Sequence, residues 1–249
     1  MKKYVSLLLC FLMIFSLAGC GGNSKEDTSA YTYSSELDIK NLDSSDADDQ
    51  CSLRAIHAVI DGLIKTDKKG NITYGIAKSE EVSEDGLTHT YKLRKDAKWA
   101  NGDPVTANDF VYAWHRIFKN KGNYYYMFAD GIASIEGAQE LSDKIDAGEE
   151  LTDDDLNSMG VKAIDDYTLE VKTTVRVSFF DELMAFPCFF PINEKFCEKQ
   201  GDKYGKSAKA ILGNGAFIMT NWEPGSIAEF KKNEDYYEAK TVKIEKLVM

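Results

Sequence analysis

The sequence predicts an α/β fold, and three stretches carry that prediction. Apolar and polar side chains alternate over residues 87–94, which is the two-residue period of a strand buried on one face. Over residues 110–118 the apolar side chains recur at helical spacing, so this stretch is expected to be a helix that buries one stripe. Residues 160–173 predict two further strands joined by a turn at Asp165-Asp166. Strands and helices therefore follow one another along the chain, as in α/β proteins.

Weaker patterns predict the elements that come before this region. Residues 31–38 alternate loosely and are expected to form the first strand. A stripe of apolar residues predicts a helix over residues 51–65, in which Gly62 loosens the last turn. Residues 68–71 predict a hairpin turn, and the acidic residues up to Asp85-Gly86 predict another turn before the alternating strand.

Capping residues define where the central helix begins. Thr106 is the expected N-cap, and Asp109 lies three residues later as in a capping box. The later elements follow from the same periods and turn signals. They are helices at 135–147, at 151–156 and between 192 and 201, strands on both sides of a turn at 222–225, and another strand from residue 240.

The N-terminal residues are expected to lie outside the folded domain. Lys2 and Lys3 precede a long apolar run, and small residues follow up to Cys20. This pattern predicts a secretory signal peptide over residues 1–19. The apolar run is shorter than the roughly 20 residues that cross a bilayer. Residues 20–30 are small and polar, so they are expected to be a flexible tether.

The small residues before Cys20 resemble the bacterial lipoprotein signal, which implies that a lipid is attached to Cys20. An ordinary signal peptide followed by an incidental cysteine is the alternative. The formal net charge of −11 would repel phosphate backbones and anionic headgroups. No nucleic-acid partner is therefore expected, and membrane attachment rests on the lipid alone.

Three cysteines follow Cys20, namely Cys51, Cys188 and Cys197. An odd number cannot form a closed disulfide framework, although one pair is possible in an oxidising compartment, with Cys188 and Cys197 the nearer two. We favour the interpretation that all three are ordinary, partly buried thiols.

Residues 81–114 resemble the signature region of the extracellular solute-binding proteins of the peptide/nickel-transport type. In that family a strand ending in K-L-R precedes K-W-x-x-G-x-P-V-T-A-x-D-F-V-Y. The matching residues are Lys92-Leu93-Arg94, Lys98-Trp99, Gly102, Pro104-Val105-Thr106-Ala107 and Asp109-Phe110-Val111-Tyr112. Further similarity lies at 61–63, 160–171, 213–217 and 233–237, whereas Ser44 replaces the proline of the family's L-D-P segment.

The resemblance implies the first lobe of a periplasmic-binding-protein type II-like fold with an inserted mixed α/β subdomain. The expected first lobe comprises residues 31–48 and 175–249, and the expected subdomain comprises residues 49–174. Family members are usually much longer. We therefore expect the second lobe to be missing, the cleft to be open on one side, and ligand binding by this chain alone to be weak.

The resemblance also implies a function as the substrate-binding lipoprotein of an ABC importer. Such a protein captures oligopeptides or a related small solute on the outer face of the cell membrane, or in the periplasm if an outer membrane is present, and delivers them to the permease. Asp38, Ile39 and Lys40 are implied to line the cleft, although from the residues alone this segment would be an edge strand. Tyr124 and Tyr125 are both candidates for a ligand-facing tyrosine, with core packing as the alternative for either ring.

The residues predict no catalytic, metal or cofactor site, so an enzyme is not expected. His57, His89 and His115 lack a Cys or His neighbour at metal-ligand spacing, and structural histidines are the default. A hydrolase would need a nucleophile–base pair that the sequence does not supply. The alternatives left open are a surface lipoprotein with a structural or signalling role, and an inactive gene fragment.

Overall fold

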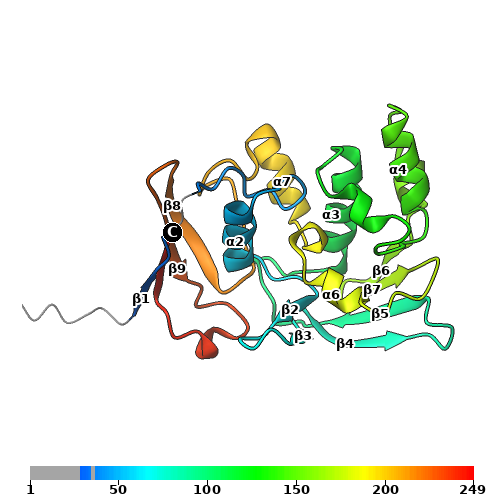
Figure 1. Ribbon diagram of the computed structural model, residues 1–249. Coiled ribbons are helices and arrows are strands. Elements are labelled where there is room, and N and C mark those ends of the chain that lie inside the picture. Colours follow the sequence, from blue (N-terminus) through cyan, green and yellow to red (C-terminus); the bar gives the residue numbers. More distant parts are fainter. Residues whose placement is uncertain (1–28, 35–36) are drawn as a thin grey trace, which may run out of the picture.

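The computed structural model describes residues 29–34 and 37–249, which form two four-stranded sheets, a pair of short strands, and helices packed beside them (Figure 1). The predicted signal peptide, Cys20 and most of the predicted tether lie outside these residues. None of the described helices has the length and apolar composition of a membrane span.

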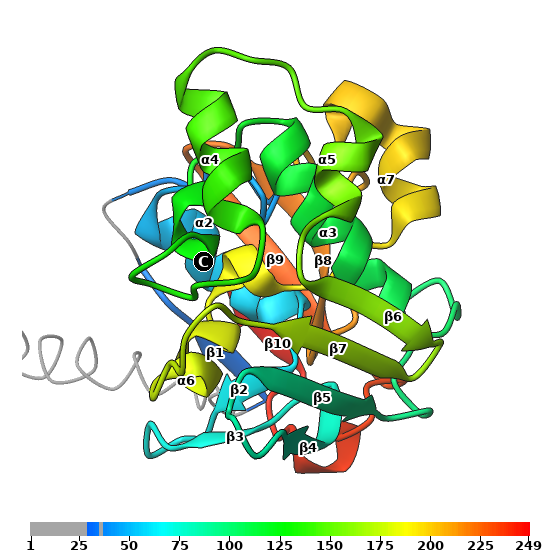
Figure 2. The ribbon, with the colours of Figure 1, turned by 90° about the vertical axis from the view of Figure 1, so that its right-hand side faces the viewer.

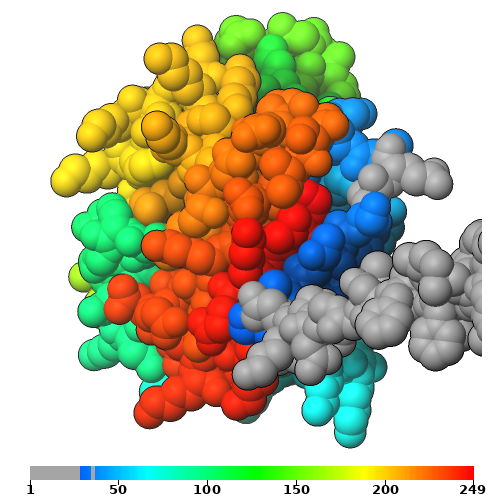
Figure 3. Space-filling view, turned by 90° about the vertical axis from the view of Figure 1, so that its left-hand side faces the viewer, coloured from blue at the N-terminus to red at the C-terminus, as the bar shows by residue number. Residues whose placement is uncertain are grey.

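The first sheet brings together two segments that are far apart in the sequence. Its strand order is β1 (Ala30–Thr32), β10 (Lys246–Val248), β9 (Ile227–Lys232) and β8 (Phe217–Glu223). Strand β1 runs parallel to β10, and the other pairs are antiparallel. Figure 3 shows β10 in red between β1 in blue and the orange surface of the β8–β9 hairpin.

Two predicted strands of this sheet have different bounds in the structure. The first strand, expected over residues 31–38, is only three residues long, because the chain leaves β10 after Tyr33. The strand expected from residue 240 begins at Lys246, because Ala239–Thr241 forms a 3-10 turn before it. The turn predicted at 222–225 lies between β8 and β9, as expected.

The second sheet is antiparallel throughout. Its strand order is β4 (Ala77–Val82), β5 (Thr88–Leu93), β7 (Thr168–Lys172) and β6 (Val161–Asp165). The alternation predicted for β5 is confirmed, since His89, Tyr91 and Leu93 are buried. β4 is a strand where the acidic residues predicted a turn, because pairing with β5 outweighs its polar composition.

Helix α2 (Gln50–Val59) is shorter than the helix predicted over residues 51–65. Ile60 is extended, and strand β2 (Ile64–Thr66) follows and pairs with β3 (Ile72–Tyr74) across the predicted hairpin turn. The apolar residues Leu63 and Ile64, which suggested a longer helix, are buried in extended chain instead. A short apolar run does not distinguish a helix from a strand.

The other helices lie close to their predicted positions. α3 (Ala107–Lys119) begins after Thr106, whose backbone N–H donates to the Asp109 carboxylate at 2.7 Å, so the predicted capping box is present. The further helices are α4 (Ala138–Asp146), α5 (Asp153–Asn157), α6 (Phe180–Met184) and α7 (Glu194–Gln200). α4 begins later than predicted because Gly137, with φ 76°, stands before it. Figure 2 shows α3, α4 and α5 on one side of the second sheet.

Two clusters of buried apolar side chains hold these elements together. The larger lies between the second sheet and the helices beside it, and its largest members include Trp99, Trp114, Phe110, Phe118 and Phe128. The smaller forms where α2 packs against the first sheet, and its members include Ile56, Val59, Met219, Phe230 and Leu247. The predicted subdomain begins at residue 49, so it would include α2. The domain boundaries stay a prediction, and this packing favours a first boundary after Ile60.

The three cysteines are all buried. The Cys51 thiol donates a hydrogen bond to the Leu37 carbonyl at 3.2 Å. Cys188 and Cys197 are separate thiols, so the pairing that their spacing left open does not occur. Burial raises the pKa of both of these thiols, which therefore stay protonated near neutral pH.

Candidate functional site

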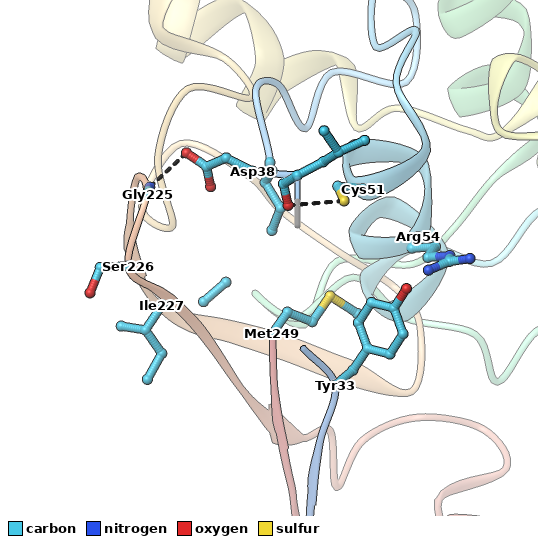
Figure 4. A pocket seen from close by; sticks show the side chains of 11 residues that line it. Tyr33, Asp38, Cys51, Arg54, Gly225, Ser226, Ile227 and Met249 are labelled. Atoms are coloured by element: carbon cyan, nitrogen blue, oxygen red, sulfur yellow. Dashed lines mark hydrogen bonds between the residues drawn. The ribbon is translucent and has the colours of Figure 1, made fainter. Parts of the chain in front are cut away.

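A pocket opens at the end of the first sheet where the parallel strands β1 and β10 reach their carboxyl ends. Tyr33 directly follows β1, Met249 directly follows β10, and both side chains lie at the pocket (Figure 4). Ligands of α/β proteins bind in crevices at the carboxyl ends of parallel strands. The cavity measures about 170 Å³ and is lined by Tyr33, Leu37, Asp38, Ile39, Cys51, Arg54, Gly225, Ser226, Ile227, Ala228 and Met249.

Backbone pairing fixes the walls of this pocket. The Tyr33 N–H donates to the Val248 carbonyl at 2.8 Å, which continues the β1–β10 pairing beyond β1. Ala228 and Met249 exchange backbone hydrogen bonds of 2.7 and 2.8 Å, which join the start of β9 to the end of β10. The pocket is therefore enclosed by the ends of β1 and β10, the β8–β9 turn with the start of β9, the segment 37–39 and one face of α2.

Two of the three residues predicted after the first strand line the pocket. The Asp38 carboxylate accepts a 2.6 Å hydrogen bond from the Gly225 N–H, which ties this segment to the β8–β9 turn. Ile39 is buried and forms part of the apolar wall. Lys40 is exposed and does not line the pocket; its backbone N–H donates to the Ser52 hydroxyl at 2.9 Å.

The two predicted tyrosines lie elsewhere, and neither lines this pocket. The Tyr124 hydroxyl donates to the Asp48 carbonyl at 3.4 Å, and its ring packs edge-on against Phe186. The Tyr125 hydroxyl donates to the Asp146 carboxylate at 2.6 Å, and this hydrogen bond raises the tyrosine pKa. The structure thus brings Asp38 and Ile39 together in the pocket and places both tyrosines apart from them. A ligand contact at either tyrosine stays a prediction.

Apart from Asp38 and Ile39, the sequence predicted none of the residues that line the pocket, and these include Arg54 and the segment 225–228. The guanidinium carbon of Arg54 lies 4.9 Å from the centroid of the Tyr33 ring, within the range of a cation–π contact. Arg54 lies three residues after Cys51 and so shares its face of α2, but the sequence alone does not indicate that this face meets the pocket. No local pattern marks the β8–β9 turn as part of a site.

A polar network joins two of the segments that resemble family motifs. The Asp61 carboxylate accepts hydrogen bonds of 2.6 and 2.5 Å from the hydroxyls of Tyr236 and Tyr237, and the Lys65 ammonium donates to Glu238 at 2.6 Å. Burial is the main cause that raises the pKa of both hydroxyls well above the ordinary value, so they remain donors. The network fixes the chain after α2 to the chain after β9, and none of these residues lines the pocket.

The three histidines occupy structural positions outside the pocket. His89 is buried, stacks on Phe180 at a centroid distance of 4.3 Å, and shares a 2.6 Å hydrogen bond with Glu80. Burial lowers the pKa of His57 and of His115. Within residues 29–34 and 37–249, no group of three or more His, Cys, Asp or Glu side chains is arranged to hold a metal ion.

The chain is similar in sequence and in fold to solute-binding proteins. The family described as "Bacterial extracellular solute-binding proteins, family 5 Middle" matches residues 71–249. The whole chain aligns at 34% identity with the oligopeptide-binding protein OppA of Bacillus subtilis (strain 168) and covers 46% of that protein. A dipeptide-binding protein of Lactococcus lactis subsp. cremoris is 32% identical; the alignment covers 91% of this chain and 40% of that protein.

Solved structures agree with these relatives. OppA of Listeria monocytogenes bound to peptide matches with a TM-score of 0.80 and 33% identity, over 88% of this chain and 42% of that one. OppA of Haemophilus influenzae in complex with RPPGFSPFR matches with a TM-score of 0.80 and 30% identity, over 90% of this chain and 42% of that one. The chain thus spans less than half the length of these relatives.

The α/β fold class and the predicted family are therefore confirmed. The family match covers most of the chain, and the fold agreement extends over 88% of it. This chain belongs to the bacterial extracellular solute-binding proteins, family 5.

Proposed function

We propose that this chain captures oligopeptides outside the cell as part of the substrate-binding component of an ABC importer. The observation that supports the proposal is the pocket at the carboxyl ends of β1 and β10, in a chain whose whole length is similar to oligopeptide-binding proteins. An extended peptide would pair its main chain with the segment around Asp38 and place one side chain in the pocket. Main-chain pairing gives affinity with little selection of sequence. The bound peptide would pass to the permease unchanged, so no catalytic role is proposed.

The size of the pocket sets the expected affinity. Its volume of about 170 Å³ is below the roughly 300–1,000 Å³ of pockets that enclose small ligands. It therefore encloses about one side chain, and much of a bound peptide would stay in contact with water. We expect this chain alone to bind peptides with a Kd of about 1 mM.

Methyl NMR tests the proposal at this affinity. Titration with penta-alanine should shift the methyl resonances of Ile227, Ala228 and Met249. Ser226→Trp places a large ring at the mouth of the pocket and should abolish these shifts. Ser207→Trp is the matched control, because Ser207 is also an exposed turn residue but does not line the pocket. Unchanged pocket resonances in the wild-type chain at saturating peptide would refute the proposal.

We also propose that a lipid on Cys20 anchors the chain to the extracytoplasmic face of the cell membrane. The support is the charged start, the apolar run and the small residues before Cys20. Mass spectrometry of the membrane-bound protein should find diacylglycerol on an N-terminal Cys20, and Cys20→Ser should release the protein from the membrane. An unmodified Cys20 in the membrane fraction would contradict the anchor.

A peptide-signalling role is the second candidate. One solved relative, with a TM-score of 0.79 and 30% identity, is described as the pheromone receptor PrgZ. The same pocket would then bind a signal peptide. Deletion of the gene distinguishes the two roles: loss of growth on peptides as the amino-acid source indicates uptake, whereas normal growth with a lost response to added peptide indicates signalling.

A further inference from the structure

Two charged side chains line the pocket, and only one of them is held by a hydrogen bond to another part of the described chain. Asp38 and Arg54 are the charged residues among those that line it. The Asp38 carboxylate accepts the Gly225 N–H at 2.6 Å and is turned toward the β8–β9 turn. Figure 4 shows Arg54 on the other side of the pocket, beside Tyr33. The two charges are therefore held apart.

Arg54 forms no ion pair with any residue of the described chain. Its guanidinium instead lies over the Tyr33 ring, a contact that orients the group and leaves its N–H donors available. Arg116, by contrast, makes two hydrogen bonds of 2.8 and 2.7 Å to Asp43. Arg176 donates to backbone carbonyls of the β4–β5 turn.

The negative charge of the whole chain indicates why the unpaired Arg54 guanidinium matters for binding an anionic ligand. A formal net charge of −11 repels anionic ligands, so an anionic ligand needs a local positive group to bind. Arginine presents donors in a planar fork that matches a carboxylate. The pocket wall also carries the apolar side chains of Ile39, Ile227 and Met249, which suit the carbon chain next to a carboxylate.

We propose that Arg54 is a specificity residue that selects peptides placing a carboxylate in this pocket. The carboxylate can come from a free C-terminus or from an acidic side chain, because both present the same two oxygens. This inference rests on the proposed function, since it names which peptides the same pocket prefers.

Two matched peptide pairs test the inference by methyl NMR titration. The first pair is penta-alanine with a free C-terminus and its C-terminal amide. The second is Ala-Ala-Glu-Ala-Ala-amide and Ala-Ala-Gln-Ala-Ala-amide. The wild-type chain should bind the acid of at least one pair about tenfold more tightly than its neutral partner, and the pair affected identifies the source of the carboxylate.

Variants assign the preference to Arg54. Arg54→Gln should bring the affinity for each acid down to that for its neutral partner, whereas Arg54→Lys should retain part of the preference through charge alone. Lys195→Gln is the control for net charge, because Lys195 is exposed on α7 and does not line the pocket. This variant should keep the full preference.

The outcomes separate this inference from the function on which it rests. Equal binding of acid and neutral peptides by the wild-type chain, or a preference that survives in Arg54→Gln, would overturn the role of Arg54 and leave peptide binding intact. Absence of binding by all four peptides would overturn the proposed function, and the role of Arg54 with it.

Discussion

Asp109 is a buried carboxyl group that should make the protein less stable as the pH rises. Its residue is 8% exposed, and burial raises its pKa to about 6 from the ordinary value of 3.8. Hydrogen bonds from Thr106 and from the Trp99 ring favour the charged form, but they do not offset the burial. The native carboxyl therefore holds its proton more tightly than the unfolded one.

The sign and size of the effect follow from this difference. Between about pH 4 and pH 6 the native state binds more protons than the unfolded state, so stability falls as the pH rises through this window. The stability that the protonated Asp109 carboxyl group contributes is complete below pH 4 and lost above pH 6. A difference of roughly two pKa units corresponds to about 3 kcal/mol in the free energy of unfolding.

Asp109→Asn removes this titration, and its amide oxygen can still accept the Thr106 N–H. The stability of the variant minus that of the wild type should increase by about 3 kcal/mol from pH 4 to pH 7. Guanidinium unfolding at each pH, followed by tryptophan fluorescence, measures this difference. Asp202→Asn, at an exposed position, makes the same charge change and should give a nearly constant difference. If the Asp109→Asn difference is also constant, or decreases with pH, burial does not control this carboxyl.

Two further predictions concern packing and an ion pair. Gly213→Ala would place its Cβ 2.1 Å from the Val59 carbonyl oxygen, so we expect a loss of about 1–3 kcal/mol in urea unfolding; an unchanged free energy of unfolding would contradict the close approach. Arg116→Ala leaves the Asp43 carboxylate without its partner in a pair whose side chains are 14% and 9% exposed, and should cost about 3 kcal/mol. Adding Asp43→Asn should cost little more, and additive losses would show that the two side chains act independently.

Local patterns predicted the elements whose physical causes are local. The alternation in β5 and the Thr106–Asp109 cap of α3 depend on neighbouring residues, and both are present in the structure. β4 was missed because its strand conformation comes from pairing with β5. The early end of α2 was missed for a similar reason: Ile64 pairs with Tyr74 across a hairpin, and the apolar run around it suits a helix as well as a strand.

The candidate site was predicted only in part, because it is assembled from distant segments. Asp38 and Ile39 came from the resemblance to the family, and both line the pocket. The opposite wall comes from the β8–β9 turn, whose Gly225 N–H bonds to Asp38 across 187 positions of sequence. A periodicity of two or four residues contains no information about such a contact. Predicting Arg54 as a pocket residue would have required knowledge of which face of α2 lies at the pocket.

The parallel pairing of β1 with β10 has a consequence for the order in which the chain folds. Ala30 pairs with Lys246, so nearly the whole chain must be synthesised before this contact can form, whereas the β4–β5 and β6–β7 hairpins join near neighbours. Closing a long loop costs conformational entropy, and distant pairings form late. These two hairpins of the second sheet should therefore form early, and the pocket at β1 and β10 should be the last part to assemble. The same pairing should also open first in the folded protein, so the Tyr33 amide, bonded to Val248, should exchange its hydrogen sooner than the amides of β5.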